Sequence, residues 1–156
     1  MFFKKKVKKD DSYGAFVNGV VMGLEAMPDQ VFSQKLMGDG FAIEPTDGIV
    51  VAPTAGDVTV VFPTGHAYGI TREDGVEVLI HLGVDTVELG GEGFEAKVSV
   101  GDKVKRGDVI CHMDLEKIRE HGKPTISAFI LTSGEKINLL RNNETVTVET
   151  NDIISF

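Results

Sequence analysis

Residues 75–87 read GVEVLIHLGVDTV, and this stretch decides the fold expected for the chain. Within it, apolar side chains occupy every second position: Val76, Val78, Ile80 and Leu82. Successive side chains of a β-strand point to opposite faces, so the alternation predicts a strand with one face in the core. Glu77, Leu79 and His81 would then face outward. A histidine beside an outward-facing leucine fits either an ordinary surface or a docking surface that carries a reactive group.

The residues before this strand predict a hairpin. Asp74-Gly75 separates the alternating strand from a second β-rich run, His66–Thr71. Asp-Gly between two such runs favours a tight antiparallel turn. The turn would put His66 within one hairpin of His81, so that two histidines on adjacent strands can share a surface. The alternation alone leaves open whether the two rings meet.

Further short strands and turns are predicted along the chain. The strands are Phe41–Glu44, Ile49–Ala52, Val58–Phe62, Glu95–Val98, Asp108–His112, Thr125–Leu131 and Thr145–Glu149. Glycine, at 18 of 156 residues, favours many turns between them. Short, evenly spaced strands are typical of an all-β antiparallel sandwich or barrel-like fold. Only two short helical segments are expected, one from an Asp29 cap to Gly38 and one from an Asp114 cap to Gly122.

Charge is distributed unevenly. The formal net charge is −8, but residues 1–9 contain five lysines and no acid, which leaves 11 basic and 24 acidic residues elsewhere. We expect residues 1–12 to form a basic flexible arm and residues 13–156 a single domain. An acidic domain excludes nucleic-acid binding by phosphate neutralisation.

The one cysteine, Cys111, excludes an intrachain disulfide and a cysteine-based zinc knuckle, and its apolar neighbours predict a small buried side chain.

Membrane and export signals are missing from the sequence. No apolar run approaches the roughly 18–20 residues of a spanning helix. The basic start is not followed by the apolar segment of a secretory signal. These features favour a cytoplasmic protein, and Met1 with a short arm favours a free-standing chain.

Histidines are the candidates for chemistry, because a neutral imidazole nitrogen is a nucleophile near neutral pH. His121, at a helix end, and His112, in a strand, are expected to be structural. His81 and Asp85 form a His-x-x-x-Asp pattern. This pattern fits either a metal site completed by His66 or a nucleophilic histidine pair with an acidic neighbour. The chain contains no nucleophile elbow, P-loop or dinucleotide-binding motif.

Several motifs, in a fixed order, resemble one protein family. They are Pro28–Phe32 with Met37–Ile43 (similar to VPDxVFxxKxxGDGxAI), Phe62–Ile70 (similar to FxTxHAxGI), residues 75–87 (similar to GxExLxHxGxDTV), then Glu92–Phe94 and Val100–Val104. From about residue 14 to residue 149 the chain therefore resembles the glucose-type IIA domains (EIIA) of the phosphoenolpyruvate-dependent sugar phosphotransferase system. The fixed order of these motifs over that length makes the resemblance very specific.

The resemblance implies a β-sandwich of the duplicated hybrid motif type with a small active-site depression. By this likeness His81 is the phosphoryl acceptor, His66 stabilises the phosphoryl oxygens and Thr64 orients His66. The implied partner-binding residues are Asp29 and Asp85, which border the site, and an apolar rim of Phe32, Leu36, Met37, Phe62, Leu79 and Val87. No cofactor or metal is required, although His66 and His81 could take up zinc incidentally.

The resemblance also implies partners. The chain would be a phosphotransferase component that accepts a phosphoryl group from the phosphohistidine of HPr. It would pass the group to a cysteine on the IIB domain of a sugar permease. Some relatives bind regulatory protein targets, and enteric relatives contact membrane through an N-terminal segment, which residues 1–9 could do weakly here.

Two other classes share local features. Residues 100–110 resemble the hairpin of biotinyl and lipoyl carrier domains, in which Lys117 would be the modified lysine. Those domains are much shorter and lack a histidine pair. The His81 and Asp85 spacing also resembles part of the zinc site of lysostaphin-type endopeptidases. The His-x-His motif that completes that site is absent from the sequence.

Overall fold

The computed structural model describes residues 10–156, and sheet dominates this part of the chain. The largest sheet has the strand order β12 (Glu144–Val146), β1 (Gly19–Gly23), β2 (Asp39–Pro45), β10 (Ser127–Leu131), β6 (Glu77–His81), β5 (Ala67–Thr71), β4 (Gly56–Val61) and β8 (Lys103–Val104). A smaller sheet has the order β3 (Ile49–Val51), β9 (Val109–Met113) and β7 (Phe94–Ala96), and β11 (Asn138–Leu139) pairs with β13 (Ile154–Ser155). Strand pairs within residues 10–156 are antiparallel.

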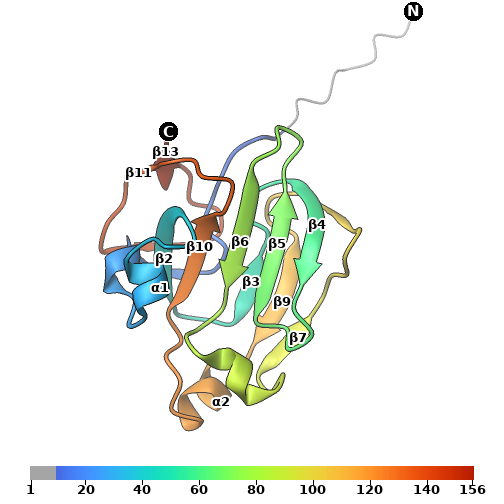
Figure 1. The fold of residues 1–156 in the computed structure, drawn as a ribbon, viewed down its shortest axis with the longest axis vertical. Helices are drawn as coiled ribbons and strands as arrows, with labels where there is room; N and C mark the ends of the chain where they lie inside the picture. The colour runs from blue at the N-terminus through green and yellow to red at the C-terminus, as the bar shows by residue number, and fades with distance from the viewer. Residues whose placement is uncertain (1–9) are drawn as a thin grey trace, which may run out of the picture.

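The predicted antiparallel sandwich is confirmed. The smaller sheet lies behind β6, β5 and β4 (Figure 1), and each strand expected from the sequence overlaps an observed one. Four observed strands were not predicted: β1, β8, β11 and β13. Three of these have only two residues, and β1 is a five-residue strand with a glycine at each end, which weakens its strand signal.

The main core lies between the two sheets, and the alternation in β6 shows why. Val78 and Ile80 are buried in it, whereas Leu79 and His81 are only partly exposed on the opposite face, as the sequence predicts. The same core cluster contains side chains from the smaller sheet, such as Val50, Ile110 and Cys111. Burial of apolar surface from both sheets is the largest favourable contribution to holding them together.

Within the described part of the chain, four short helical segments accompany the sheets: η1 (Leu24–Ala26), α1 (Gln30–Ser33), η2 (Thr86–Leu89) and α2 (Leu115–Glu120). The Asp29 carboxylate accepts hydrogen bonds from the N–H groups of Val31 and Phe32, and the Asp114 carboxylate accepts one from Lys117. Both predicted caps are therefore confirmed, because a side-chain oxygen satisfies N–H groups that have no partner within the helix.

No helix within residues 10–156 is long and apolar enough to span a membrane.

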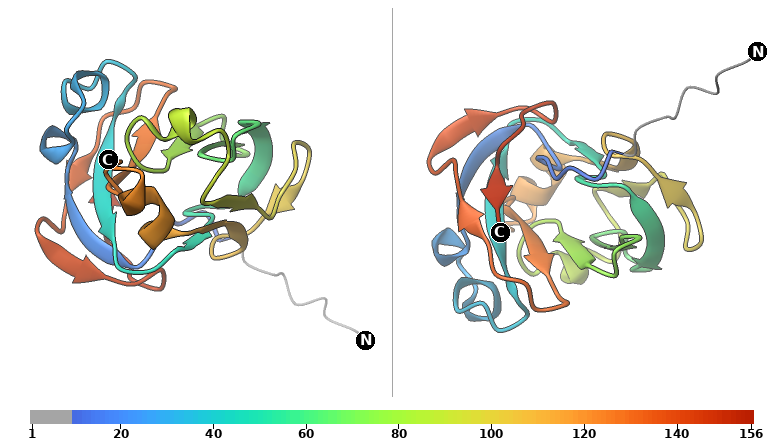
Figure 2. Two further views of the ribbon diagram at one scale, coloured as in Figure 1. Left: turned by 90° about the horizontal axis from the view of Figure 1, so that it is seen from below. Right: turned by 90° about the horizontal axis from the view of Figure 1, so that it is seen from above.

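A second, smaller core lies on the outer face of the large sheet. Leu24 of η1, Met27 just after it and Phe32 of α1 pack against Ala128 and Ile130 of β10. Leu79 of β6 packs against the same cluster. This packing holds α1 next to the end of β6 at which His81 stands. Figure 2 (left) looks onto this end of the molecule, where α2 and the segment around η2 also lie.

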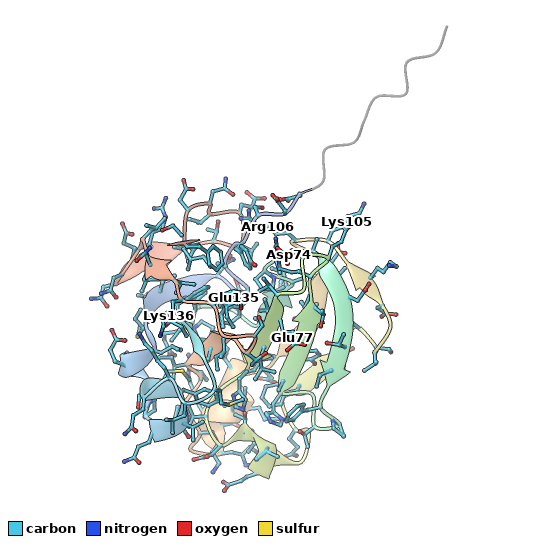
Figure 3. The ribbon with its side chains drawn as sticks, turned by 45° about the horizontal axis from the view of Figure 1, so that its top comes forward. Asp74, Glu77, Lys105, Arg106, Glu135 and Lys136 are labelled. Atoms are coloured by element: carbon cyan, nitrogen blue, oxygen red, sulfur yellow. The ribbon has the colours of Figure 1, made fainter. Side chains whose placement is uncertain are left out.

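The opposite end of the sandwich carries charged side chains, several of which Figure 3 labels. Arg72, which is buried, donates to the Asp74 carboxylate and to Thr54, and its guanidinium lies 4.2 Å from the centre of the Tyr13 ring. Arg106 donates to the Ser12 hydroxyl and to the Asn151 side chain. These contacts join the first described residues to the body. The expected membrane contact falls on residues 1–9, outside the described residues.

The close pairing of β2 with β10 predicts how much stability is lost when a methyl group is added at Gly40. A Cβ added at Gly40 would clash with the carbonyl oxygen of Phe129, which belongs to the backbone of the neighbouring strand. We expect Gly40→Ala to lower the free energy of unfolding by about 3 kcal/mol, measured by urea denaturation. At Gly23 the added Cβ would meet only the end of the exposed Glu25 side chain, which can move away. Gly23→Ala should therefore cost less than about 1 kcal/mol, and equal costs for both variants would contradict this account.

Candidate functional site

Two histidines meet where the β5–β6 hairpin ends. The register pairs Ala67 with His81, and the Leu82 N–H donates to the His66 carbonyl at 2.7 Å. The two imidazole rings lie with centres 5.1 Å apart and planes 80° to each other. The hairpin predicted at Asp74-Gly75 is thus present, and it brings together the two histidines whose meeting the sequence left open.

His81 is held through one ring nitrogen. Its Nδ1 lies 2.9 Å from the Gly83 carbonyl oxygen, which can only accept, so Nδ1 carries the proton and Nε2 keeps a free lone pair. The Phe32 ring packs against the imidazole at 4.7 Å between centres. Burial lowers the pKa of His81, while the hydrogen bond to Gly83 and the Asp29 and Asp85 carboxylates act in the opposite direction.

His66 is more deeply enclosed, with 2% of its surface exposed. Its Nδ1 lies 2.6 Å from the Thr64 hydroxyl oxygen. Phe62 stands edge-on at 5.2 Å between ring centres, and Phe94 lies at 6.4 Å. Burial, followed by the neighbouring His81, lowers the pKa of His66 from 6.5 to about 4. Both imidazoles are therefore neutral at neutral pH.

The two predicted aspartates approach His81 from different segments. Asp29 caps α1, and Asp85 precedes η2 with a left-handed backbone, at a φ of 57°. Both carboxylates raise the pKa of His81, so both lie close enough to act on its ring electrostatically. Among residues 10–156, the charged groups that act on the His81 ring are these two carboxylates.

Most of the predicted apolar residues have exposed side chains. Leu36, Met37, Phe62 and Val87 have exposed side chains, and Leu79 is partly exposed. Phe32 differs, because only 6% of its surface is exposed. It belongs to the second core and supports the His81 ring, so it offers little surface to a partner.

The other candidate residues of the sequence lie outside the histidine pair or lack the further groups that a catalytic or metal site needs. Lys117 lies within α2, and the Cys111 thiol is buried and weakly contacts the Gly65 carbonyl at 3.8 Å. His112 is exposed on β9, and His121 Nε2 contacts Glu92 at 2.9 Å. Among residues 10–156, no three His, Cys, Asp or Glu side chains are grouped as they would be around a metal ion.

Three features of the site escaped the sequence reasoning. They are the Gly83 carbonyl, the Phe94 ring and the buried Ser127 hydroxyl, which accepts a hydrogen bond from the Gly83 N–H at 3.0 Å. The sequence does hold a signal for the first feature, because a glycine follows His81 by two residues and glycine favours turns. In the structure Gly83 adopts a positive φ of 73°. The other two depend on contacts between segments far apart in the sequence.

Comparisons with known proteins place the chain in a family. Residues 11–137 match the family model for the phosphoenolpyruvate-dependent sugar phosphotransferase system, EIIA 1. The chain is 46% identical over 149 residues to a glucose-specific EIIA component of Staphylococcus aureus, covering 94% of this chain and 90% of that protein. It is 48% identical over 121 residues to the corresponding component of Halalkalibacterium halodurans, covering 78% and 70% of the two chains.

A solved structure is similar over nearly the whole chain. Glucose permease IIA from Mycoplasma capricolum matches with a TM-score of 0.85 and 33% identity, covering 99% of both chains. The family match, the sequence identity and the fold therefore agree, and the chain belongs to the EIIA 1 family of the phosphoenolpyruvate-dependent sugar phosphotransferase system.

Proposed function

We propose that this chain carries a phosphoryl group on Nε2 of His81, accepting it from the phosphohistidine of HPr and delivering it to a cysteine of a permease IIB domain. One observation carries the proposal. The Gly83 carbonyl holds the proton on Nδ1 of His81, so the lone pair of Nε2 is free beside a second buried histidine. A neutral, oriented imidazole nitrogen is the nucleophile that such a transfer needs. Membership of the EIIA 1 family supports the same role.

The transfer proceeds by two displacements at phosphorus. In the first, the Nε2 lone pair forms a P–N bond, and the bond to the HPr histidine breaks with its electron pair returning to that ring. In the second, the cysteine thiolate of the IIB domain attacks phosphorus, and the P–N bond electrons return to Nε2 of His81. The proton on Nδ1 stays in place throughout, so the ring leaves as a neutral imidazole. No metal or other cofactor takes part in either step.

His66 stabilises the phosphoryl group on His81 while the group is delivered to the IIB domain. When the Thr64 hydroxyl donates to Nδ1 of His66, the remaining ring proton sits on Nε2 and is available to a phosphoryl oxygen. The nearly perpendicular rings, 5.1 Å apart between centres, leave the second imidazole beside the reacting nitrogen. Preorganised donors at the developing charge are the main protein contribution to phosphoryl transfer.

The surroundings favour passing the group on rather than retaining it. The charged groups that act on His81 are the carboxylates of Asp29 and Asp85, which do not bind a phosphoryl group. A partner would supply the positive charge and would bind both aspartates. The exposed side chains of Leu36, Met37 and Phe62 would pack against the apolar part of the same partner surface. Because both partners use this surface, they would bind one after the other.

The phosphorylation site can be tested directly. Incubation with phosphoenolpyruvate, enzyme I and HPr should label the chain with an acid-labile, base-stable phosphoryl group. His81→Ala removes the nucleophile and should abolish labelling. His112→Ala, which removes an exposed histidine on β9, should label normally. Labelling of His81→Ala at the rate of the unchanged protein would refute the assignment.

The proposed role of His66 can be tested by measuring acceptance and delivery of the phosphoryl group separately. We expect His66→Ala to accept the phosphoryl group but to deliver it to a IIB domain about 100-fold more slowly, because one stabilising donor is lost. Thr64→Val should show a weaker defect of the same kind, since only the hydroxyl that orients His66 is removed, and Thr64→Ser should restore delivery. Single-turnover transfer measured by rapid quench gives both rates. Normal delivery by His66→Ala would contradict the proposed role.

The buried histidine also predicts how stability depends on pH. The pKa of His66 is about 4 in the folded chain and about 6.5 when unfolded. As the pH falls below 6.5 the unfolded state binds a proton that the folded state does not, so stability is lost between pH 6.5 and pH 4. The loss through His66 should reach about 3 kcal/mol in urea titrations. His66→Gln should flatten this region and His112→Gln should not; an unchanged slope in His66→Gln would count against a buried neutral imidazole.

A further inference from the structure

Ser127 has a buried hydroxyl that contacts Gly83, the residue whose carbonyl binds the His81 ring. Its side chain has no exposed surface. The hydroxyl donates to the Thr125 carbonyl at 2.9 Å and accepts from the Gly83 N–H at 3.0 Å. A serine hydroxyl has one proton. Because that proton goes to Thr125, an oxygen lone pair is left to face Gly83.

Further contacts hold the turn after β6 in the same way. The Thr86 hydroxyl donates to the Leu82 carbonyl at 2.5 Å, so the peptide that joins Leu82 to Gly83 is bound by a hydroxyl at each end. The Val84 N–H donates to the Pro124 carbonyl at 3.2 Å. Gly83 lies between these anchors with a left-handed backbone, and a Cβ there would clash with Thr86. The direction of the Gly83 carbonyl is therefore set mainly by contacts from outside the turn.

We propose that Ser127 is a positioning residue for phosphoryl transfer: by fixing the Leu82–Gly83 peptide it restricts the turn, so that the carbonyl of the following Gly83–Val84 peptide points at Nδ1 of His81 and Nε2 stays free and directed at the site. The proposal rests on the function proposed above for His81. Ser127 is the first residue of β10, and the next residue, Ala128, pairs with His81 across β10 and β6. The central strand of the large sheet thus holds both the backbone of His81 and the group that orients its ring.

Loss of the hydroxyl has a defined physical consequence. In Ser127→Ala the Gly83 N–H stays buried without its acceptor, which is costly enough to favour a shift of the turn. A shifted Gly83 carbonyl no longer selects the Nδ1–H tautomer, so part of the population carries its proton on Nε2 and cannot attack phosphorus. Docking should be unaffected, because the exposed apolar side chains and both aspartates of the site are left intact.

Spectroscopy and kinetics together test the proposal. With 15N-labelled histidine, the ring nitrogen shifts of His81 should report the Nδ1–H tautomer in the unchanged protein and a mixture in Ser127→Ala. The pKa of His81 should fall in the variant, because the hydrogen bond to Gly83 favours the protonated ring, while His66, Asp29 and Asp85 remain. Transfer from phospho-HPr should show a kcat about tenfold lower with an unchanged KM. Ser127→Thr keeps the hydroxyl and should restore both readouts.

A matched control comes from the other end of the same strand pair. Ser133 also accepts a hydrogen bond from a backbone N–H, that of Glu77 at 2.8 Å, at the end of β6 remote from His81. Figure 3 labels Glu77 below Asp74 in that view. Ser133→Ala should leave the tautomer, the pKa and kcat unchanged. If Ser127→Ala does not fold, Ser127→Cys, with its weaker acceptor, should give a smaller change in the same direction.

The outcomes separate this proposal from the proposed function. An unaltered His81 tautomer and an unaltered kcat in Ser127→Ala would overturn the positioning role, even if His81 is phosphorylated. A rise in KM with normal kcat would also overturn it, because the defect would then lie in docking. If the unchanged protein is not phosphorylated at all, the proposed function fails. The tautomer measurement would still show whether Ser127 orients the ring.

Discussion

The antiparallel register of β5 and β6 is the constraint on which the site depends. It pairs Ala67 with His81 and sets His66 beside it, across a hairpin closed at Asp74-Gly75. A shift of one residue would turn His81 into the core and move Val78 and Ile80 out of it. The apolar alternation that stabilises the sandwich therefore also fixes the relative position of the two imidazoles. Stability and the geometry of the site share one cause.

Burial then determines the chemistry of the two rings, but to different degrees. His66 is enclosed and has a pKa of about 4, whereas the carboxylates of Asp29 and Asp85 and the Gly83 carbonyl partly offset the effect of burial on His81. Each ring is tied through Nδ1, one to Thr64 and the other to Gly83. Under the proposed function, the ring bound to a hydroxyl serves as a donor and the ring bound to a carbonyl serves as a nucleophile. The different partners of the same ring atom give the two histidines different tasks.

A phosphoryl carrier must release its cargo, and the surroundings of His81 fit that requirement. Its neighbours are a phenylalanine ring, a second neutral imidazole and two carboxylates. None of these groups binds a phosphate with the strength of a bidentate arginine contact. The charge that stabilises the transferring group would arrive only with a partner. The carrier would then bind the group weakly when alone and transfer it when docked.

Much of the fold and part of the site can be predicted from local patterns. The alternation in β6, the Asp74-Gly75 turn and the Asp29 and Asp114 caps all depend on residues close in the sequence, and the structure confirms each of them. Motif order also suggested His66, His81 and Thr64 as the central residues. The strand β1 was not predicted, because the glycine at each of its ends weakens the strand pattern. In the structure it forms by pairing with β2.

The sequence by itself determined which residues alternate, turn and cap, because those properties depend on side-chain type and short spacing. It also placed two histidines at one end of a predicted hairpin, where the structure has His81 at the end of β6 and His66 immediately before β5. Only the tertiary structure decided how each ring is oriented and how deeply it is buried. Ser127 reaches Gly83 across 44 residues of chain, and Phe32 reaches His81 from helix α1. Such contacts exist only once β10 has paired with β6 and α1 has packed on the sheet, so no local pattern contains them.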